Sequence, residues 1–284
     1  MNFSLSDEQI AAYGRDGFIA HRAFLSPSEV SELKAAVLAA IAGVGRNKIA
    51  SRDDAETMTE GDTYYDSVFT QKLLLSRISD TIKRYMLHPE LGRMCTRLEQ
   101  ANEITAPDDS PVDGFRVWHD QALIKEPYGN PTAWHLDTPY WSFCSRHALS
   151  IWIALEDATL ENGAMWFIPG SHRLANFENV PIGQNLSSLF KVYPEMTGVD
   201  PVPVPMKAGD CSFHNGLTAH GAGANMTRGR RIAMTCAYMP IGSTFNGNRN
   251  ILPPALLGQL EVGDVLEDDD WNPIVHQETT RSTP

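Results

Sequence analysis

A series of short β-rich segments between residues 112 and 240 constrains the fold more than any other feature of the chain. Gly, Pro and Asn residues separate these segments, so each one ends in a turn after a few residues. The expected strands are 114–124, 133–137, 148–155, 164–168, 211–214 and 230–239. Many short strands predict a mainly β protein, and a double-stranded β-helix (a jelly-roll, cupin-like core) would enclose a roomy interior.

The segment before this β-rich region has a mostly helical pattern. Ser26 and Glu29 form a capping box around Pro27, which predicts that a helix begins there and ends near Gly43-Val-Gly45. The other expected elements are a short helix at 6–14, a strand at 17–24 and a helical stretch over about 69–99, broken near His88-Pro89. Helices followed by many short strands indicate helices packed on the outside of a β core.

We expect a single domain over residues 1–284. Residues 1–110 would form a mostly helical N-terminal support, 111–240 the jelly-roll core and 241–284 a C-terminal extension. The polar, Pro-containing segment 174–208 is predicted to be a loop or lid over the mouth of the core, where substrate contacts are common. A hydrophobic content of 42% is enough for a core of this size.

The excess of acidic residues limits the possible partners. Lys and Arg number 23 against 35 Asp and Glu, a net charge of -12 at pH 7. This argues against nucleic acid and anionic membrane surfaces and leaves a small-molecule substrate as the expected partner. The acidic run 267–270 is expected to be a solvated turn. Nothing in the sequence indicates an oligomeric state.

The cysteines and the ends of the chain bear on localisation. Cys95, Cys144, Cys211 and Cys236 form neither a Cys-x-x-Cys pair nor a Cys/His zinc spacing, so they are expected to be buried, reduced thiols. No signal-like segment opens the sequence and no long apolar run occurs in it. A cytoplasmic protein is therefore expected.

His135 and Asp137 are candidate metal ligands. They lie two apart in an aromatic, β-favouring run, and residues two apart in a strand point to the same face. An imidazole beside a carboxylate is two-thirds of the 2-His-1-carboxylate facial triad. On its own such a pair is more often a surface pair. The missing ligand would be a distant histidine, and the candidates are His147, His172, His214 and His220, the last of which is followed by glycine.

The strand expected at 230–239 has the pattern of a cavity wall. Arg231 shares one face with the small residues Ala233, Thr235 and Ala237, while apolar residues occupy the other face. A guanidinium binds a carboxylate through two parallel hydrogen bonds, so Arg231 is a candidate for holding an anionic ligand. Trp152 also has small neighbours on its face. It has two equally supported interpretations, as a core residue or as a flat wall against a ligand.

Taken in order, these motifs resemble the phytanoyl-CoA dioxygenase (PhyH) family of Fe(II)/2-oxoglutarate-dependent oxygenases. The matching segments are His135-x-Asp137, 161–173, 208–210, His220, Asn225, Arg231 (eleven residues after His220) and the N-terminal stretches 9–18 and 25–26. The resemblance covers most of the chain. It implies that His135, Asp137 and His220 bind iron, that Arg231 pairs with the distal carboxylate of 2-oxoglutarate, and that Gln121 and Trp152 lie near this cosubstrate.

The resemblance also implies a reaction. With Fe(II), O2 and 2-oxoglutarate, and with ascorbate as a possible support, such an enzyme hydroxylates or desaturates an unactivated C–H bond of a small metabolite and releases succinate and CO2. No catalytic residue is expected beyond the metal centre. Because relatives that halogenate have a small residue in place of the carboxylate, Asp137 disfavours halogenation.

Contacts to the substrate itself are the least constrained part. The candidates are Arg116 (for a substrate anion), His119, Tyr140 and Trp141, although each is more often a core residue. Two other functions compete with the oxygenase: a non-catalytic jelly-roll protein that keeps a metal, and a cupin-like metalloenzyme that does not use 2-oxoglutarate. Arg231 and Asn225 argue against both.

Overall fold

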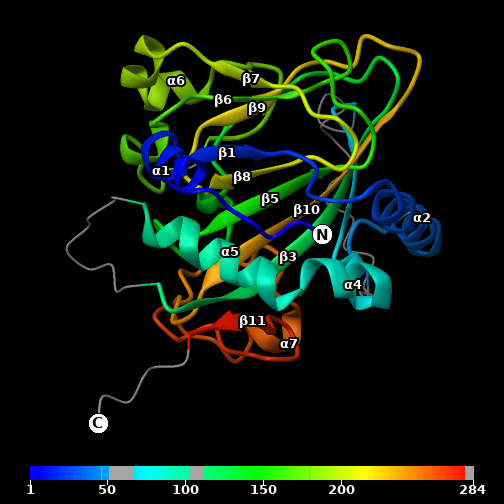
Figure 1. Ribbon diagram of the computed structural model, residues 1–284. Helices are drawn as coiled ribbons and strands as arrows, with labels where there is room; N and C mark the ends of the chain where they lie inside the picture. The colour runs from blue at the N-terminus through cyan, green and yellow to red at the C-terminus, as the bar shows by residue number, and fades with distance from the viewer. Residues whose placement is uncertain (46, 51–66, 103–111, 179, 279–284) are drawn as a thin grey trace.

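Two antiparallel sheets make up the centre of the protein (Figure 1). The computed structural model describes residues 1–45, 47–50, 67–102, 112–178 and 180–278. The larger sheet has the order β1-β8-β5-β10-β3-β11, with β2 also paired to β3, and the smaller sheet has the order β4-β9-β6-β7. This is the jelly-roll arrangement that the strand pattern predicts.

The strands of the larger sheet are β1 (Phe18–His21), β2 (Thr70–Leu73), β3 (Gly114–Lys125), β5 (Leu149–Ala154), β8 (Cys211–Asn215), β10 (Arg231–Pro240) and β11 (Ile274–Gln277). Those of the smaller sheet are β4 (Thr132–His135), β6 (Met165–Phe167), β7 (Val202–Val204) and β9 (His220–Ala222). The α-helices are α1 (Asp7–Asp16), α2 (Pro27–Val44), α4 (Asp80–Met86), α5 (Pro89–Gln100), α6 (Leu189–Val192) and α7 (Pro254–Leu257). Single 3-10 turns are η1 (Leu75–Arg77), η2 (Thr138–Tyr140), η3 (Ser171–Arg173) and η4 (Pro194–Gly198).

The two faces of the larger sheet have different roles. On the outer face, apolar side chains of β10 such as Met234 and Cys236 join the main core, together with Leu91 and Met94 of α5, which crosses this sheet (Figure 1). On the inner face, a second cluster combines residues of both sheets: Trp152, Ala154, Ala158, Met165, Phe167, Val204, Met206, Ala222 and Ala233. The inner residues of β5 and β10 are mostly small, with Trp152 and Arg231 as the large exceptions.

Local signals locate the long helices. The Ser26 side chain accepts from the Glu29 backbone N–H and the Glu29 side chain accepts from Ser26, so the capping box predicted at the start of α2 is confirmed. α5 begins at Pro89 with His88 as its N-cap, which confirms the break expected there. Helix α1 ends at Gly17, whose φ of 82° suits glycine.

The helical stretch expected over 69–99 is wrong at its beginning. Residues 70–73 form β2, which pairs antiparallel with residues 121–124 of β3, and α4 begins only at Asp80. The backbone hydrogen bonds offered by β3 outweigh the weak helical preference of this segment. The sequence pattern also missed the short strands β7, β9 and β11.

The segment 174–208 is less irregular than a loop. It contains α6, η4 and β7, and its apolar residues Leu189, Tyr193 and Met196 pack with Leu136 and Leu217 in a small cluster. Leu136 lies between His135 and Asp137, so this segment packs directly behind the candidate metal ligands.

Cysteine burial, the acidic run 267–270 and the helices can be compared with the expectations from the sequence. Cys95, Cys211 and Cys236 are buried free thiols, whereas Cys144 is exposed, contrary to expectation. In the acidic run 267–270 the Asp269 side chain is 75% exposed, yet it forms an ion pair with Arg116. Within the described ranges, no helix has both the length and the apolar character needed to cross a bilayer.

Candidate metal centre

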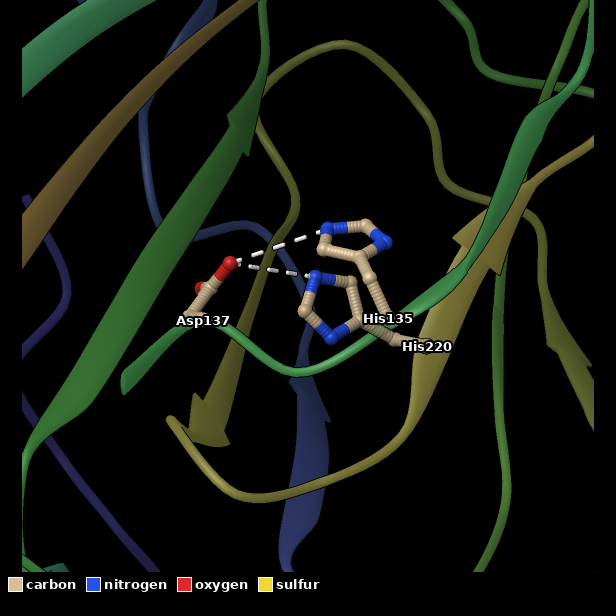
Figure 2. A group of neighbouring side chains, drawn as sticks. All are labelled: His135, Asp137 and His220. Atoms are coloured by element: carbon tan, nitrogen blue, oxygen red, sulfur yellow. Dashed lines mark ion pairs between the residues drawn. The ribbon is translucent and has the colours of Figure 1, made fainter. Parts of the chain in front are cut away.

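Pairing of β4 with β9 brings two histidines together. His135, the last residue of β4, and His220, the first of β9, are register partners, and their ring centroids lie 4.1 Å apart. Figure 2 shows both rings beside Asp137, which follows β4. The Oδ1 atom of Asp137 is 3.7 Å from His135 Nε2 and 3.6 Å from His220 Nε2. The three donor atoms lie within 4.8 Å of one another, a spacing that fits one metal ion.

Asp137 reaches this position through a turn, and its expected place in a strand at 133–137 is wrong. β4 ends at His135, and Asp137 has helical backbone angles (φ -83°, ψ -51°) at the start of η2. The backbone N–H groups of Asp137 and Thr138 both donate to the carbonyl of Gly216, at 2.8 and 3.0 Å. A Cβ on Gly216 would lie 2.1 Å from Thr138 Oγ1, so only glycine permits this close approach.

The protonation states suit a divalent metal. His135 Nδ1 lies 2.8 Å from the Ala133 carbonyl and His220 Nδ1 lies 2.9 Å from that of Thr218, so Nδ1 carries the proton and Nε2 presents its lone pair toward Asp137. Burial lowers the pKa of both imidazoles and favours their neutral form. Burial alone would raise the pKa of Asp137, but the surrounding His220, His214 and His135 bring it below its usual value.

The other candidate histidines lie elsewhere or play another part. His147 pairs with the buried Glu99, and His172 is buried beneath Gly17. His214 is next to the centre: its Nε2 lies 3.3 Å from Asp137 Oδ2, and its ring centroid lies 4.6 Å from that of His220.

Arg231 lies on the inner face, and none of the described carboxylates forms an ion pair with it, although the charge of Glu156 acts to raise its pKa. It is 2% exposed, its guanidinium carbon lies 5.0 Å above the Trp152 ring, and its one hydrogen bond in the described structure is a long one of 3.3 Å to the Gly163 carbonyl. Arg231 Nε and Trp152 Nε1 are both buried without a hydrogen-bond partner. Burial lowers the pKa of Arg231 to about 10, which still leaves it charged at neutral pH. A bound anion would complete the hydrogen bonds of this buried guanidinium.

Lys125 is a second buried cation that the sequence reasoning missed. It is the register partner of Arg231 and fully buried, and its Nζ donates to the Asn130 carbonyl at 2.6 Å. Burial, followed by the charge of Arg231, lowers its pKa to about 7. In the described part of the chain no carboxylate pairs with either cation. The signal was available, because Lys125 follows Gln121 by four residues and therefore shares its face of β3.

Gln121 and Trp152 are linked to the metal ligands through the inner face. Both are register partners of Thr235 in β10, and the Gln71 side chain donates to Gln121. Two residues before Trp152 on β5, Ser150 donates to Asp137 Oδ2 at 3.1 Å. Since two strand residues span about 7 Å, the metal centre and the Arg231 cation lie at neighbouring places on the inner face of the larger sheet.

The four candidate substrate residues separate into two groups. His119 is buried, its Nδ1 has no hydrogen-bond partner in the described structure, and its ring meets Trp141 edge-on at 6.3 Å. Burial lowers its pKa to about 4 although the Asp137 charge opposes this, so His119 is neutral and within electrostatic reach of Asp137. The Tyr140 hydroxyl donates to the Val180 carbonyl of segment 174–208. The Arg116 guanidinium, in contrast, is held by Asp269 and the Asn272 carbonyl of the C-terminal segment.

The chain is similar to known proteins in both sequence and structure. The family model described as Phytanoyl-CoA dioxygenase (PhyH) matches residues 13–233. The bovine (Bos taurus) phytanoyl-CoA dioxygenase domain-containing protein 1 is 25% identical over 287 residues, covering 88% of this chain and 95% of that protein. Ectoine dioxygenase of Bordetella bronchiseptica is 27% identical over 271 residues, covering 88% and 80%.

Two solved structures from nogalamycin biosynthesis are also similar. The non-heme alpha ketoglutarate dependent carbocyclase SnoK superposes with a TM-score of 0.74 at 27% identity, covering 95% of this chain and 96% of that chain. The epimerase SnoN, in complex with Fe3+, alpha ketoglutarate and nogalamycin RO, gives a TM-score of 0.72 at 26% identity and covers 95% and 98%.

Proposed function

Since the chain belongs to the phytanoyl-CoA dioxygenase (PhyH) family and is a 2-oxoglutarate-dependent non-haem iron dioxygenase, we propose that His135, Asp137 and His220 are its iron ligands. Two neutral imidazoles and one carboxylate form the facial triad that such iron sites use. Their Nε2 and Oδ1 atoms converge within the span that one metal ion needs. Bound iron supplies the activation of O2, and the protein's part is to position the reactants and to exclude water.

Arg231 is the proposed partner of the distal carboxylate of 2-oxoglutarate, and this carries the functional proposal. A buried guanidinium with a free Nε is costly unless a ligand completes its hydrogen bonds. Lys125 beside it adds a second positive charge, and the Trp152 ring forms the wall beneath the guanidinium. Gln121, on the same face of β3, would contact the cosubstrate between this pocket and the metal. A protein that only stored a metal would have no need for this arrangement.

The substrate is proposed to be a small organic molecule that lies against His119 and Trp141. A neutral imidazole whose Nδ1 lacks a partner offers a donor or an acceptor to a polar group of the substrate. Tyr140 would tie the segment 174–208 over this side of the cavity through its bond to the Val180 carbonyl. Arg116 is the weaker candidate for a substrate anion, because Asp269 already neutralises it.

The proposed reaction is hydroxylation, or desaturation, of an unactivated C–H bond. As an iron ligand, Asp137 would take the position that a halide needs on the metal, which disfavours halogenation. Two of the similar proteins are a carbocyclase and an epimerase, so the product has to be identified directly. The test of the class is succinate release from 2-oxoglutarate by the purified protein with Fe(II) and ascorbate, with and without a panel of candidate metabolites.

Substitution of Arg231 separates the three possible functions. We expect Arg231→Met to weaken 2-oxoglutarate binding by about a hundredfold, since a bidentate charged pair is lost, and to leave Fe(II) binding intact. Arg230→Met, one residue away and exposed, is the matched control and should bind normally. Wild-type protein that binds iron without any effect of 2-oxoglutarate would identify a metal-binding protein, and turnover without 2-oxoglutarate would identify a cupin-like enzyme.

A further inference from the structure

We propose that Ser150 and His214 act together as a clamp that leaves only one oxygen of Asp137 free to bind the metal. The proposal rests on the assignment of Asp137 as an iron ligand. It concerns two positioning residues that do not touch the metal themselves.

The two oxygens of the Asp137 carboxylate have separate partners. Oδ2 accepts from Ser150 Oγ at 3.1 Å and lies 3.3 Å from His214 Nε2. Oδ1 has neither of these contacts and faces the Nε2 atoms of His135 and His220, at 3.7 and 3.6 Å. The carboxylate is therefore oriented by two donors that contact Oδ2, and it presents Oδ1 to the metal position.

The clamp is built into the sheet. Ser150 of β5 and His214 of β8 are direct register partners on the inner face, and both are nearly fully buried. The His214 ring packs against Phe167 and against His220, with centroid separations of 5.4 and 4.6 Å. Its Nδ1 is buried without a partner. A buried imidazole whose one polar contact in the described structure is the Asp137 oxygen fits a role in orienting that carboxylate.

The orientation of Asp137 matters because it sets how many coordination positions on the iron stay open. A facial triad with a one-oxygen carboxylate leaves three positions, of which the two-point ligand 2-oxoglutarate takes two and leaves one for O2. If Asp137 rotated to bind through both oxygens, it would fill that last position. Hydrogen bonds from Ser150 and His214 to Oδ2 oppose this rotation and so keep the O2 position open.

Nitric oxide, a stable substitute for O2 that gives an electron paramagnetic resonance signal on Fe(II), tests the clamp directly. The anaerobic Fe(II)–2-oxoglutarate complex is first recorded by its visible charge-transfer absorption. We expect S150A and S150A/H214F to keep this absorption, and the double variant to bind nitric oxide at least about tenfold more weakly, the scale of a lost hydrogen bond to a charged group.

Two further variants are controls. Glutamine at position 214 places an amide N–H near the position of His214 Nε2, so S150A/H214Q should bind nitric oxide more tightly than S150A/H214F. A histidine with a merely structural role would give no such recovery. S142A removes a different buried serine hydroxyl, one that donates to the Arg249 carbonyl at 3.0 Å, and should behave as wild type.

Each result decides between the proposals. If the double variant keeps the absorption and binds nitric oxide as tightly as wild type, the clamp is refuted. If the double variant no longer holds iron, S150A alone, which deletes a single oxygen atom, is compared with wild type. Weaker nitric oxide binding by S150A supports the clamp, and equal binding refutes it. Absence of the charge-transfer absorption in the wild-type protein would instead refute the proposed function, so the two failures are distinguishable.

Discussion

Replacement of Lys125 by Met should make the cosubstrate-free protein more stable and its 2-oxoglutarate binding weaker. Lys125 is fully buried beside Arg231 without a carboxylate partner in the described structure. Its pKa falls from 10.5 to about 7, mainly because burial disfavours the charged form. Between pH 7 and 10.5 the unfolded chain therefore holds a proton at this position that the folded protein has released.

The sign and size of the effect follow from proton linkage. The free energy of unfolding rises with pH across this window, by at most about 1.4 kcal/mol per pH unit and about 5 kcal/mol in total. At pH 7, methionine removes the free-energy penalty of burying the Lys125 amine. It also leaves the Asn130 carbonyl without its 2.6 Å donor, which costs about 1–3 kcal/mol. We expect a net gain of about 2 kcal/mol at pH 7 in K125M. Loss of the cation should weaken 2-oxoglutarate binding about tenfold.

Urea unfolding at pH 7, 8 and 9, with chelator and without 2-oxoglutarate, measures the stability difference. The wild-type curve should rise with pH relative to that of K125M, so the two approach each other as pH increases. Lys83→Met on the exposed side of α4 is the control and should keep the wild-type pH dependence. The reasoning is refuted if K125M has the wild-type slope between pH 7 and 9 or a lower urea midpoint at pH 7.

Two other substitutions test the cavity and the turn beside the metal centre. Gly216→Ala places a Cβ 2.1 Å from Thr138 Oγ1 and should lower the free energy of unfolding, measured by urea unfolding, by about 2–4 kcal/mol. Gly183→Ala is the control: a Cβ there meets open space and should change the free energy of unfolding little. His119→Phe should reduce substrate-coupled succinate formation at least about tenfold, the scale of one buried hydrogen bond to a ligand. Its 2-oxoglutarate affinity, measured by titration, should stay near that of wild type. A large loss of that affinity would contradict the assignment of His119 to the substrate side.

Periodicity and local signals predicted much of the fold. Alternation on β10 places Ala233 in the inner cluster and Met234 in the main core as expected, but Ala237, beside a register shift, also joins the main core. The capping box of α2 and the break before Pro89 occur where the sequence indicates them. These features depend on neighbours along the chain, so they can be read from it. The error at β2 arises because its conformation depends on pairing with β3, about fifty residues away in sequence.

By itself the sequence determined the family, the jelly-roll class and a short set of polar residues with the chemistry of an iron and 2-oxoglutarate site. Tertiary structure decided how that set is assembled. Register between β4 and β9 brings His220, and not His214, opposite His135. A turn held by the Gly216 carbonyl, and not strand alternation, directs Asp137 toward them. Lys125 and the Ser150–His214 pair gain their significance only from burial and cross-strand contact. Strand alternation could place Lys125 on the same face as Gln121, but its lowered pKa and the contacts to Asp137 come from desolvation and from hydrogen bonds between distant segments.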